Sequence, residues 1–304
     1  MQVVIGNNSI PLIYSDRLMG LATYVNVSVT EKTWEDLPSD MLGRYIWYRK
    51  NSYYQRPYLS MGNSAQKYLD IDSYEWVDHT WEWPEGHNSL DDLWGIYVWH
   101  WDDTTIYLSS GLYHQHQLSG NTWYVRTWSN YEGPEYGDRA WKWEDTTYYS
   151  SGVHQYGVIG NPGINDWYRS PWAYHSSAAS FYGEGLWSDN PKLYCPKWIP
   201  QNEQYPYANH HVYYSAGNIQ GVLYPSTRDV EVKTWNGLKS FNGEDVWSNL
   251  TNIFYSDNNR HYVLDPVSST WYRINLGLNF YGRDVWTDLH GRWYVNNTHE
   301  LHFG

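Results

Sequence analysis

Residues 241–274 read FNGEDVWSNLTNIFYSDNNRHYVLDPVSSTWYRI, and this stretch decides the fold because it contains four short apolar runs. The runs occupy 245–247, 252–256, 261–264 and 269–273, and clusters of Asn, Asp, Ser, Thr and Pro separate them. Such clusters favour tight turns, so the stretch predicts four antiparallel strands joined by hairpins. Four strands in about 35 residues is the size of one blade of a β-propeller.

Signatures of this unit recur along the chain. In the first strand a glycine stands four residues before a tryptophan, at Trp47, Trp99, Trp141, Trp187, Trp247 and Trp286. These anchors are 52, 42, 46, 60 and 39 residues apart, which are blade-sized steps with two insertions. An aromatic signature that ends in serine marks the second strand. A glycine that can adopt a positive φ in a hairpin follows it at Gly62, Gly111, Gly152 and Gly217. Paired tryptophans mark the fourth strand, namely Trp76 with Trp81, Trp123 with Trp128, and Trp167 with Trp172.

The two ends of the chain fit the same template incompletely. The N-terminal region offers strands at 2–5, 12–16, 23–27 and 31–34, whereas the C-terminal unit offers only three, at 284–286, 292–295 and 300–303. A ring of blades must close or expose sheet edges, so we expect the strand at 2–5 to complete the last blade. The sequence therefore predicts an all-β chain that forms a single β-propeller over residues 1–304. We expect seven four-stranded antiparallel blades, with six as the alternative, and an inserted loop at about 189–211.

The composition supports this class and restricts the partners. The chain has 32 Tyr and 21 Trp, which suit half-buried strands, and its 24 Gly and 13 Pro interrupt every helical period. A formal charge of −13 argues against nucleic acid and anionic membranes as partners. No apolar run is long enough to insert in a membrane, and the N-terminus lacks the basic and apolar regions of a signal peptide. The single Cys195 excludes an internal disulfide framework, so we expect folding in a cytoplasm.

The repeats, with G-x-x-[hydrophobic]-W followed by [YF]-Y-S and Y-x-L, resemble those of kelch-like propeller proteins. They are most similar to the aromatic-rich kelch-like repeat proteins of tailed bacteriophages, and the resemblance extends from about residue 5 to 303. It departs from cellular kelch repeats in one respect, because the chain has no Gly-Gly pair. The resemblance implies a non-enzymatic virion structural protein, associated with the tail or fibre or decorating the particle. Its partners would be other virion proteins and a host surface glycan. A phage protein is made in the host cytoplasm and released by lysis, which is consistent with a chain that has neither a signal peptide nor disulfides.

Two other classes of function stay open. A carbohydrate-active enzyme needs paired carboxylates, and acidic pairs occur at 91–92, 102–103, 144–145 and 244–245. Most of them fall at the same place in the repeat, which predicts a structural turn role. An intracellular kelch-type adaptor is the other alternative, but the chain has no room for the partner module expected of one. We predict neither a metal site nor a cofactor, because His114 and His116 would share one side of a strand without a recurrent third ligand.

Binding is expected from aromatic residues that the repeat does not require. We assign the six anchor tryptophans to packing, and take Trp83 and Trp94 as binding candidates outside the inserted loop. Within the loop the candidates are Tyr194, Trp198, Tyr205 and Tyr207, on a backbone that four prolines restrict. The loop lies between the first and second strands of one blade, so it would emerge on one rim of the ring. Two roles for it stay open, namely binding a partner and shielding a sheet edge.

Overall fold

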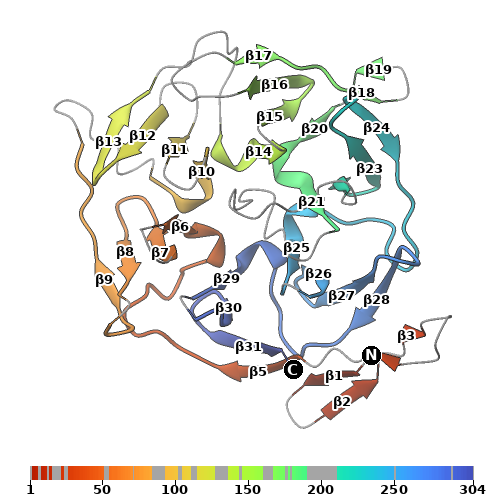
Figure 1. Cartoon of the computed structure of the whole chain (residues 1–304). Coiled ribbons are helices and arrows are strands. Elements are labelled where there is room, and N and C mark those ends of the chain that lie inside the picture. The colour runs from red at the N-terminus through yellow and green to blue at the C-terminus, as the bar shows by residue number, and fades with distance from the viewer. Residues whose placement is uncertain are drawn as a thin grey trace.

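The chain forms a ring of six β-sheets arranged radially around one axis (Figure 1). The computed structural model describes residues 27–303 and four short strands before them, with gaps in 27–303 at 51–54, 71, 84–92, 102–104, 111–114, 127–135, 144–145, 160–166, 175–176, 179, 190–210, 250 and 289. Each blade contains four antiparallel strands numbered outward from the axis. The prediction of a single all-β propeller is therefore confirmed, and the number of blades is six rather than seven.

The first three blades follow one another directly along the chain. Blade 1 contains β6 (Ile46–Lys50), β7 (Gln55–Ser60), β8 (Gln66–Leu69) and β9 (Trp76–Asp78). Blade 2 contains β10 (Val98–His100), β11 (Ile106–Ser109), β12 (Gln115–Ser119) and β13 (Thr122–Val125). Blade 3 contains β14 (Ala140–Trp143), β15 (Thr146–Gly152), β16 (His154–Ile159) and β17 (Tyr168–Arg169), and β20 (Phe181–Tyr182) also pairs with β15.

The remaining blades complete the ring. Blade 4 contains β21 (Leu186–Ser188), β22 (Val212–Ala216), β23 (Ile219–Tyr224) and β24 (Asp229–Val232). It is extended by β18 (Ala173–Tyr174), which runs parallel to β24, and by β19 (Ser177–Ala178). Blade 5 contains β25 (Val246–Ser248), β26 (Ile253–Asp257), β27 (Arg260–Asp265) and β28 (Thr270–Ile274). Blade 6 contains β29 (Val285–Thr287), β30 (Trp293–Val295), β31 (His299–Phe303) and β5 (Val27–Glu31).

Blade 6 closes the ring with a strand from each end of the chain. β5 pairs antiparallel with β31, with Val29 opposite Leu301, and Val27 is fully buried. The expectation that the N-terminal region completes the last blade is confirmed, but the predicted strand is wrong. Instead, β1 (Gln2–Ile5) pairs with β2 (Asn8–Pro11), and β3 (Tyr14–Ser15) pairs with β4 (Ala22–Thr23). The first 26 residues lack the glycine–tryptophan anchor, so they form no seventh blade.

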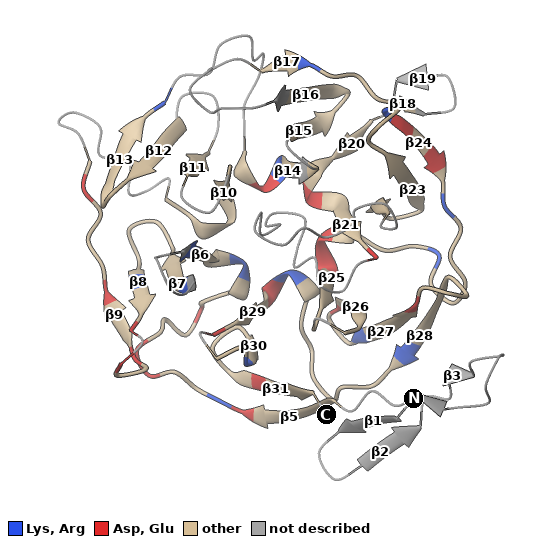
Figure 2. Cartoon of the chain, viewed as in Figure 1, with Lys and Arg blue, Asp and Glu red and all other residues tan. Residues whose placement is uncertain are grey.

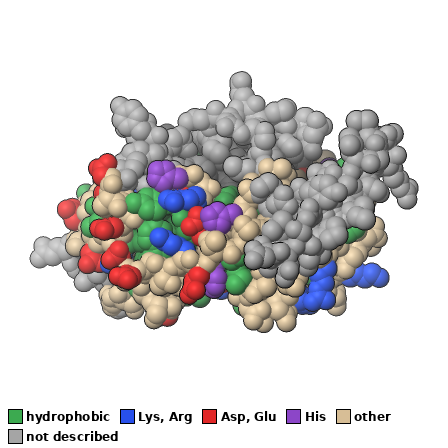
Figure 3. Space-filling view, turned by 90° about the horizontal axis from the view of Figure 1, so that it is seen from below, with side chains coloured by type: hydrophobic (Ala, Val, Ile, Leu, Met, Phe, Trp, Pro, Cys, Tyr) green, Lys and Arg blue, Asp and Glu red, His purple; other side chains and the backbone are tan. Residues whose placement is uncertain are grey.

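The outer edge of blade 6 carries polar and charged side chains around the closing strand. Thr30 and His302 are hydrogen-bonded at 3.1 Å, and Nε2 of His302 lies 3.5 Å from Oε1 of Glu300. Figure 3 shows acidic, basic and histidine side chains interspersed with apolar ones on this side of the ring. Charges on an edge strand discourage pairing with another chain, so the closing strand is protected against aggregation.

The anchor tryptophans pack between neighbouring blades, as predicted. Each is buried and stacks on the aromatic residue opposite it in the second strand, at centroid distances of 4.5–4.9 Å, in the pairs Trp47–Tyr58, Trp99–Tyr107, Trp141–Tyr148, Trp187–Tyr213, Trp247–Phe254 and Trp286–Tyr294. In five blades the indole Nε1 donates to the hydroxyl of the second-strand serine at 2.8–2.9 Å. In blade 6 it donates to the carbonyl oxygen of Asn296. The serine therefore recurs in these second strands because its hydroxyl accepts a hydrogen bond from the buried indole N–H.

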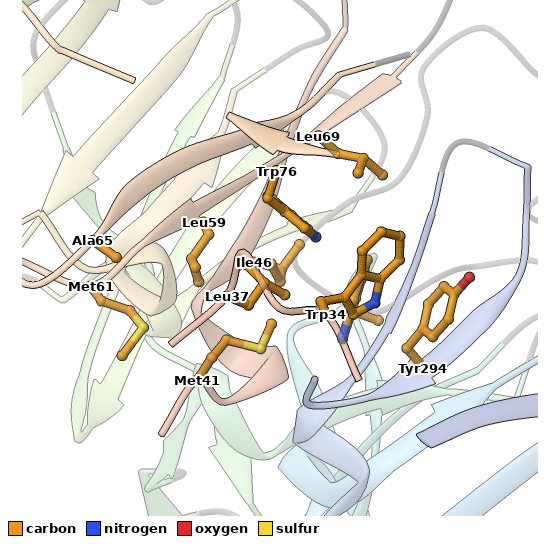
Figure 4. Packing of buried hydrophobic residues seen from close by; sticks show 11 residues of the cluster. Trp34, Leu37, Met41, Ile46, Leu59, Met61, Ala65, Leu69, Trp76 and Tyr294 are labelled. Atoms are coloured by element: carbon orange, nitrogen blue, oxygen red, sulfur yellow. The ribbon is translucent and has the colours of Figure 1, made fainter. Parts of the chain in front are cut away.

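A second layer of aromatic residues fills each junction, and Figure 4 shows it between blades 6 and 1. Trp34 packs edge-on against Tyr294 at 5.9 Å, and Trp76 packs against Trp286 at 5.7 Å. Trp34 follows β5 in the chain and has left the sheet, so the fourth-strand role predicted for it is wrong. Apolar side chains on both sides of a junction tie the blades together, since each sheet has two faces to bury.

The hairpins between second and third strands adopt the backbone conformation that was predicted. Gly62, Gly152 and Gly217 have φ values of 55°, 66° and 60°. Asn258 and Asn296 take the equivalent place in blades 5 and 6 with φ values of 56° and 52°. Asn tolerates this region better than other residues with a side chain. Gly111 lies outside the described residues. In the described part of the chain, no helix is long and apolar enough to cross a membrane.

Candidate binding site

Six short 3-10 turns, one before the first strand of each blade, form the innermost layer of the ring (Figure 1). They are η1 (Gly43–Tyr45), η3 (Gly95–Tyr97), η4 (Gly137–Arg139), η5 (Gly183–Gly185), η7 (Gly243–Asp245) and η8 (Gly282–Asp284). Each turn contacts the next, and η8 contacts η1, so the layer is a closed ring. We call it the turn ring.

Close backbone contact explains why each turn begins with glycine. A Cβ at any of the six glycines would lie 1.9–2.1 Å from the carbonyl oxygen of the third residue of the preceding turn. No side chain fits at such a distance, so glycine is required at every junction. This requirement is the physical origin of the glycine–tryptophan spacing in the sequence.

The second and third residues of the turns differ from blade to blade, although the glycine and the tryptophan around them do not change. Figure 2 shows charged residues on several of these inner turns. The pairs are Arg44-Tyr45, Ile96-Tyr97, Asp138-Arg139, Glu184-Gly185, Glu244-Asp245 and Arg283-Asp284. The turn ring therefore presents a different chemistry in each blade on a constant backbone.

Ion pairs cross three of the junctions in the turn ring. Arg44 binds the buried Asp284 of the preceding turn through two hydrogen bonds of 2.7 and 2.9 Å. Arg283 binds Glu244, and its Nε lies 3.5 Å from Oδ1 of Asp245. At the junction of blades 3 and 4 the signs are exchanged, because Arg139 is the third residue of its turn and donates to Glu184 at 3.3 Å. Three of these pairs link the second residue of one turn to the third residue of the turn before it, whereas Arg283 and Glu244 are both second residues.

Burial changes the protonation of two carboxyl groups in the turn ring. It raises the pKa of Asp245 to about 7, because the charge of Arg283 only partly offsets the loss of solvent and Glu244 adds repulsion. Burial also raises the pKa of Glu184, and the nearby charge of Asp138 raises it further, while Arg139 opposes both effects. Both side chains therefore hold a proton more strongly than an exposed carboxyl group.

Aromatic side chains lie beside the turns of blades 1 to 4, in two contacting pairs and one further ring. We call this set the aromatic arc, and it comprises Tyr45, Trp94, Tyr97, Tyr136 and Tyr182. Tyr45 packs edge-on against Trp94 at 5.2 Å, and Tyr97 lies 5.7 Å from Tyr136.

The guanidinium group of Arg139 completes the aromatic arc on the side of blades 3 and 4. It lies 5.2 Å from the ring of Tyr136 and 5.0 Å from that of Tyr182. The same guanidinium donates to Glu184, and its Nη1 donates to the hydroxyl of Ser151 at 2.9 Å. Arg139 is thus fixed between two aromatic rings.

Of the two predicted binding residues that the structure describes, Trp94 belongs to this arrangement and Trp83 does not. Trp94 stands directly before η3 and is half-buried within the aromatic arc. Trp83 instead stacks on Trp123 at 6.3 Å and contacts the buried His116, in the junction between blades 1 and 2. Its neighbour Glu82 is bridged to Thr122 of β13, so Trp83 lies far out along the blade.

The inserted loop candidates Tyr194, Trp198, Tyr205 and Tyr207 lie outside the described residues. The base of the loop is described, and Asp189 fixes it by accepting from the backbone N–H of His211 at 2.9 Å and from the hydroxyl of Tyr213 at 3.0 Å. The loop leaves blade 4 at the end of β21 that is remote from η5, because η5 precedes this strand and the loop follows it. The two residues from which the loop departs, Asp189 and His211, therefore lie at the end of β21 opposite η5.

Of the acidic pairs noted in the sequence, the structure describes only 244–245. This pair lies in the turn ring, as expected for residues with a structural turn role in the repeat. The sequence analysis missed Tyr45, Tyr97, Tyr136, Tyr182 and Arg139. A signal for them existed, because an aromatic residue directly precedes the anchor glycine in four of the six repeats, at Trp94, Tyr136, Tyr182 and Tyr281.

No family model matches the chain, and no curated protein matches it. Among solved structures it is similar to the extracellular domain of a hybrid two component system from B. thetaiotaomicron, with a TM-score of 0.45 and 11% identity over 87% of this chain and 32% of that one. It is also similar to the extracellular domain of a one component system from the same organism, with a TM-score of 0.44 and 10% identity over 88% of this chain and 32% of that one. The chain thus spans about a third of the length of these two proteins. The WD40 β-propeller domain of Doa1 gives a TM-score of 0.41 and 10% identity, over 91% of this chain and 97% of that one.

Proposed function

We propose that this chain is a non-enzymatic binding protein displayed on the surface of a tailed-bacteriophage particle, in the tail or fibre region or as a decoration. The observation that carries the binding role is the turn ring, in which the glycines and tryptophans are constant and the pair of residues that follows the glycine is different in every blade. A rigid frame that carries variable side chains is the usual design of a recognition surface. The ligand is either another virion protein or a glycan of the host surface.

Binding is favoured over catalysis by the way the charged groups are used. The carboxylates of Asp284 and Glu184 are held in ion pairs with arginines across the blade junctions. Such pairs hold neighbouring turns together, and the aromatic rings beside them supply contact area. A propeller scaffold hosts many unrelated functions, so the argument for binding rests on these side chains and not on the fold.

The virion location is supported by the sequence. The aromatic-rich repeats resemble those of phage kelch-like proteins. The acidic net charge of −13 is compatible with a soluble particle component and unfavourable for a nucleic-acid partner.

Mass spectrometry of purified phage particles tests the location, and an adsorption assay tests the role. We expect the chain among the virion proteins at a fixed copy number, and we expect an antibody against it to reduce adsorption or tail assembly. Absence from intact particles would contradict the virion location. Hydrolysis of an oligosaccharide by the purified protein, lost in Glu244→Gln, would favour the carbohydrate-active enzyme instead.

A further inference from the structure

We propose that the aromatic arc is a stacking platform for an uncharged oligosaccharide of hexopyranose units. This inference rests on the binding role proposed above and names its ligand class. The arc carries five aromatic rings, as the pairs Tyr45–Trp94 and Tyr97–Tyr136 and as Tyr182, which Arg139 links to Tyr136. Tyr and Trp offer a large rigid face at low conformational cost, and the apolar C–H face of a pyranose ring is a matching surface.

The exposed end of the platform lies at blades 3 and 4. Tyr182 is 40% exposed, and the rings of Tyr136, Tyr97 and Trp94 are half-buried. A ring that is half-buried is held in place by its neighbours and keeps part of its surface available to a ligand. The arc therefore combines fixed geometry with accessible aromatic area, which lowers the entropy cost of binding.

The polar groups beside the arc suit hydroxyl groups better than charges. The side chains of Glu184 and Arg139 are 35% and 23% exposed, so a hydroxyl can donate to the first and accept from the second. Sites for small molecules typically combine apolar contact with a few such polar groups.

The charged groups in this part of the turn ring are paired with one another, Arg139 with Glu184 and Arg283 with Glu244. A cationic ligand would have to compete with these arginines for the carboxylates, and an anionic ligand with the carboxylates for the arginines. An uncharged ligand rich in hydroxyl groups avoids both costs, so the geometry points to a neutral sugar chain.

The repeat supplies a matched control for testing the platform. Tyr281 stands directly before the anchor glycine of blade 6, at the same position as Tyr182 in blade 4, but it lies outside the arc. It also contacts an arginine, with the guanidinium group of Arg283 4.8 Å from its ring. Replacing either tyrosine with alanine removes an aromatic ring in an equivalent setting.

The experiment is a screen of the purified full chain against neutral, sialylated and amino-sugar oligosaccharides, followed by titration calorimetry with the best neutral ligand. We expect neutral oligosaccharides to bind, and we expect Tyr182→Ala and Trp94→Ala each to weaken binding by about tenfold or more, equivalent to about 1.4 kcal/mol. Tyr281→Ala should leave the affinity within about threefold, equivalent to less than about 1 kcal/mol. Thermal unfolding of each variant shows whether the ring stays folded, and Tyr182→Ala carries the test if Trp94→Ala does not fold.

Three results would overturn the platform: a preference for sialylated or amino sugars, no binding of any neutral oligosaccharide, or an equal loss of affinity in Tyr281→Ala. The virion location is tested by a separate experiment. If the chain is found in particles but the pure protein binds no neutral sugar, only the platform proposal is overturned. If the pure protein binds neutral sugar but the chain is absent from particles, only the virion location is overturned.

Discussion

Replacing Asp245 with asparagine should make the protein more stable at pH 8 than the unchanged chain. Asp245 is 2% exposed, and its arginine neighbour in the turn ring, Arg283, also binds Glu244. Burial raises its pKa from the ordinary 3.8 to about 7. Between these two values the folded protein keeps a proton that the unfolded chain releases. The contribution of Asp245 to the free energy of unfolding is therefore largest below pH 4 and is lost as the pH rises to 7.

The size of the effect follows from the pKa shift. Each pH unit between the two pKa values changes the free energy of unfolding by about 1.4 kcal/mol. About two of these units lie between pH 5 and the folded pKa of about 7. An asparagine side chain cannot ionise, so Asp245→Asn should gain on the order of 3 kcal/mol relative to the unchanged chain between pH 5 and pH 8. Urea unfolding of both proteins at the two pH values measures this difference.

Asp284→Asn is the matched control, because Asp284 is the equivalent residue of the next turn and is equally buried. One of its two hydrogen bonds from Arg44 is lost in the variant, because an amide nitrogen cannot accept, and the arginine is left half-buried without a counter-ion. We expect a loss of about 1–3 kcal/mol at pH 8. A loss of stability in Asp245→Asn at pH 8 as large as that in Asp284→Asn would refute the reasoning, since it would mean that Asp245 is ionised and stabilised by Arg283.

Five further changes test the ring and its insertion. Ser150→Ala leaves a buried indole N–H without its acceptor and should cost about 1–3 kcal/mol in urea unfolding. Gly95→Ala places a Cβ 1.9 Å from a carbonyl oxygen and should prevent folding, as judged by circular dichroism. Gly120→Ala meets nothing within 4 Å and should cost only about 1–2 kcal/mol for its positive φ, so equal effects of the two glycine changes would contradict the close-contact argument. A chain that begins at residue 33 lacks the strand at 27–31 and should unfold at a markedly lower temperature than one that begins at residue 24. Replacing residues 192–207 with a short Gly-Ser bridge should leave the unfolding temperature of the ring nearly unchanged, and collapse of the ring would show that the loop is structural.

The sequence was sufficient to predict the blade because the blade is held together by short-range rules. The glycine before each anchor tryptophan is required by backbone contact, and the serine of the second strand accepts from the buried indole. Both requirements repeat in nearly every blade, so they appear as a pattern in one sequence. Counting the anchors alone gives six, which is the number of blades.

The closing strand could not be predicted with the same certainty, because its partner lies at the other end of the chain. Thr30 and His302 are 272 residues apart, and no local rule links them. The strand at 2–5 was predicted for this place because of its apolar pattern, and residues 27–31 lay between the strands predicted at 23–27 and 31–34. In the ring, Val27 of the closing strand is fully buried in the junction of blades 5 and 6.

The candidate site was predicted only in part for a related reason. Trp94 was noticed because no repeat requires it, whereas its partner Tyr45 belongs to the preceding blade. A site that spans several blades depends on which turns are neighbours around the axis. That information comes from the closure of the ring, so single repeats read in isolation do not contain it.

Correlated differences between the repeats show which positions serve the scaffold. In blades 4 and 6 an aspartate follows the first strand, and the second strand carries a tyrosine whose hydroxyl donates to it, in the pairs Tyr213–Asp189 and Tyr294–Asp288. In blade 5 the equivalent pair is Phe254 with Asn249, and Asn249 accepts from the backbone of its own loop instead. The two positions change together because a buried hydroxyl needs an acceptor and a phenyl ring does not.

In the turn ring, the residues of neighbouring turns do not change together in this way. Arg44 and Arg283 each pair with an aspartate at the third position of the preceding turn. The residue at that position is Gly185 for Glu244 and Tyr45 for Ile96. Residues that served only to join the blades would be expected to repeat one successful pair at every junction, as the glycines do. Their divergence places the aromatic arc on one side of the ring and most of the ion pairs on the other. An asymmetric surface on a nearly symmetric scaffold is what the binding role proposed for the inner turns requires.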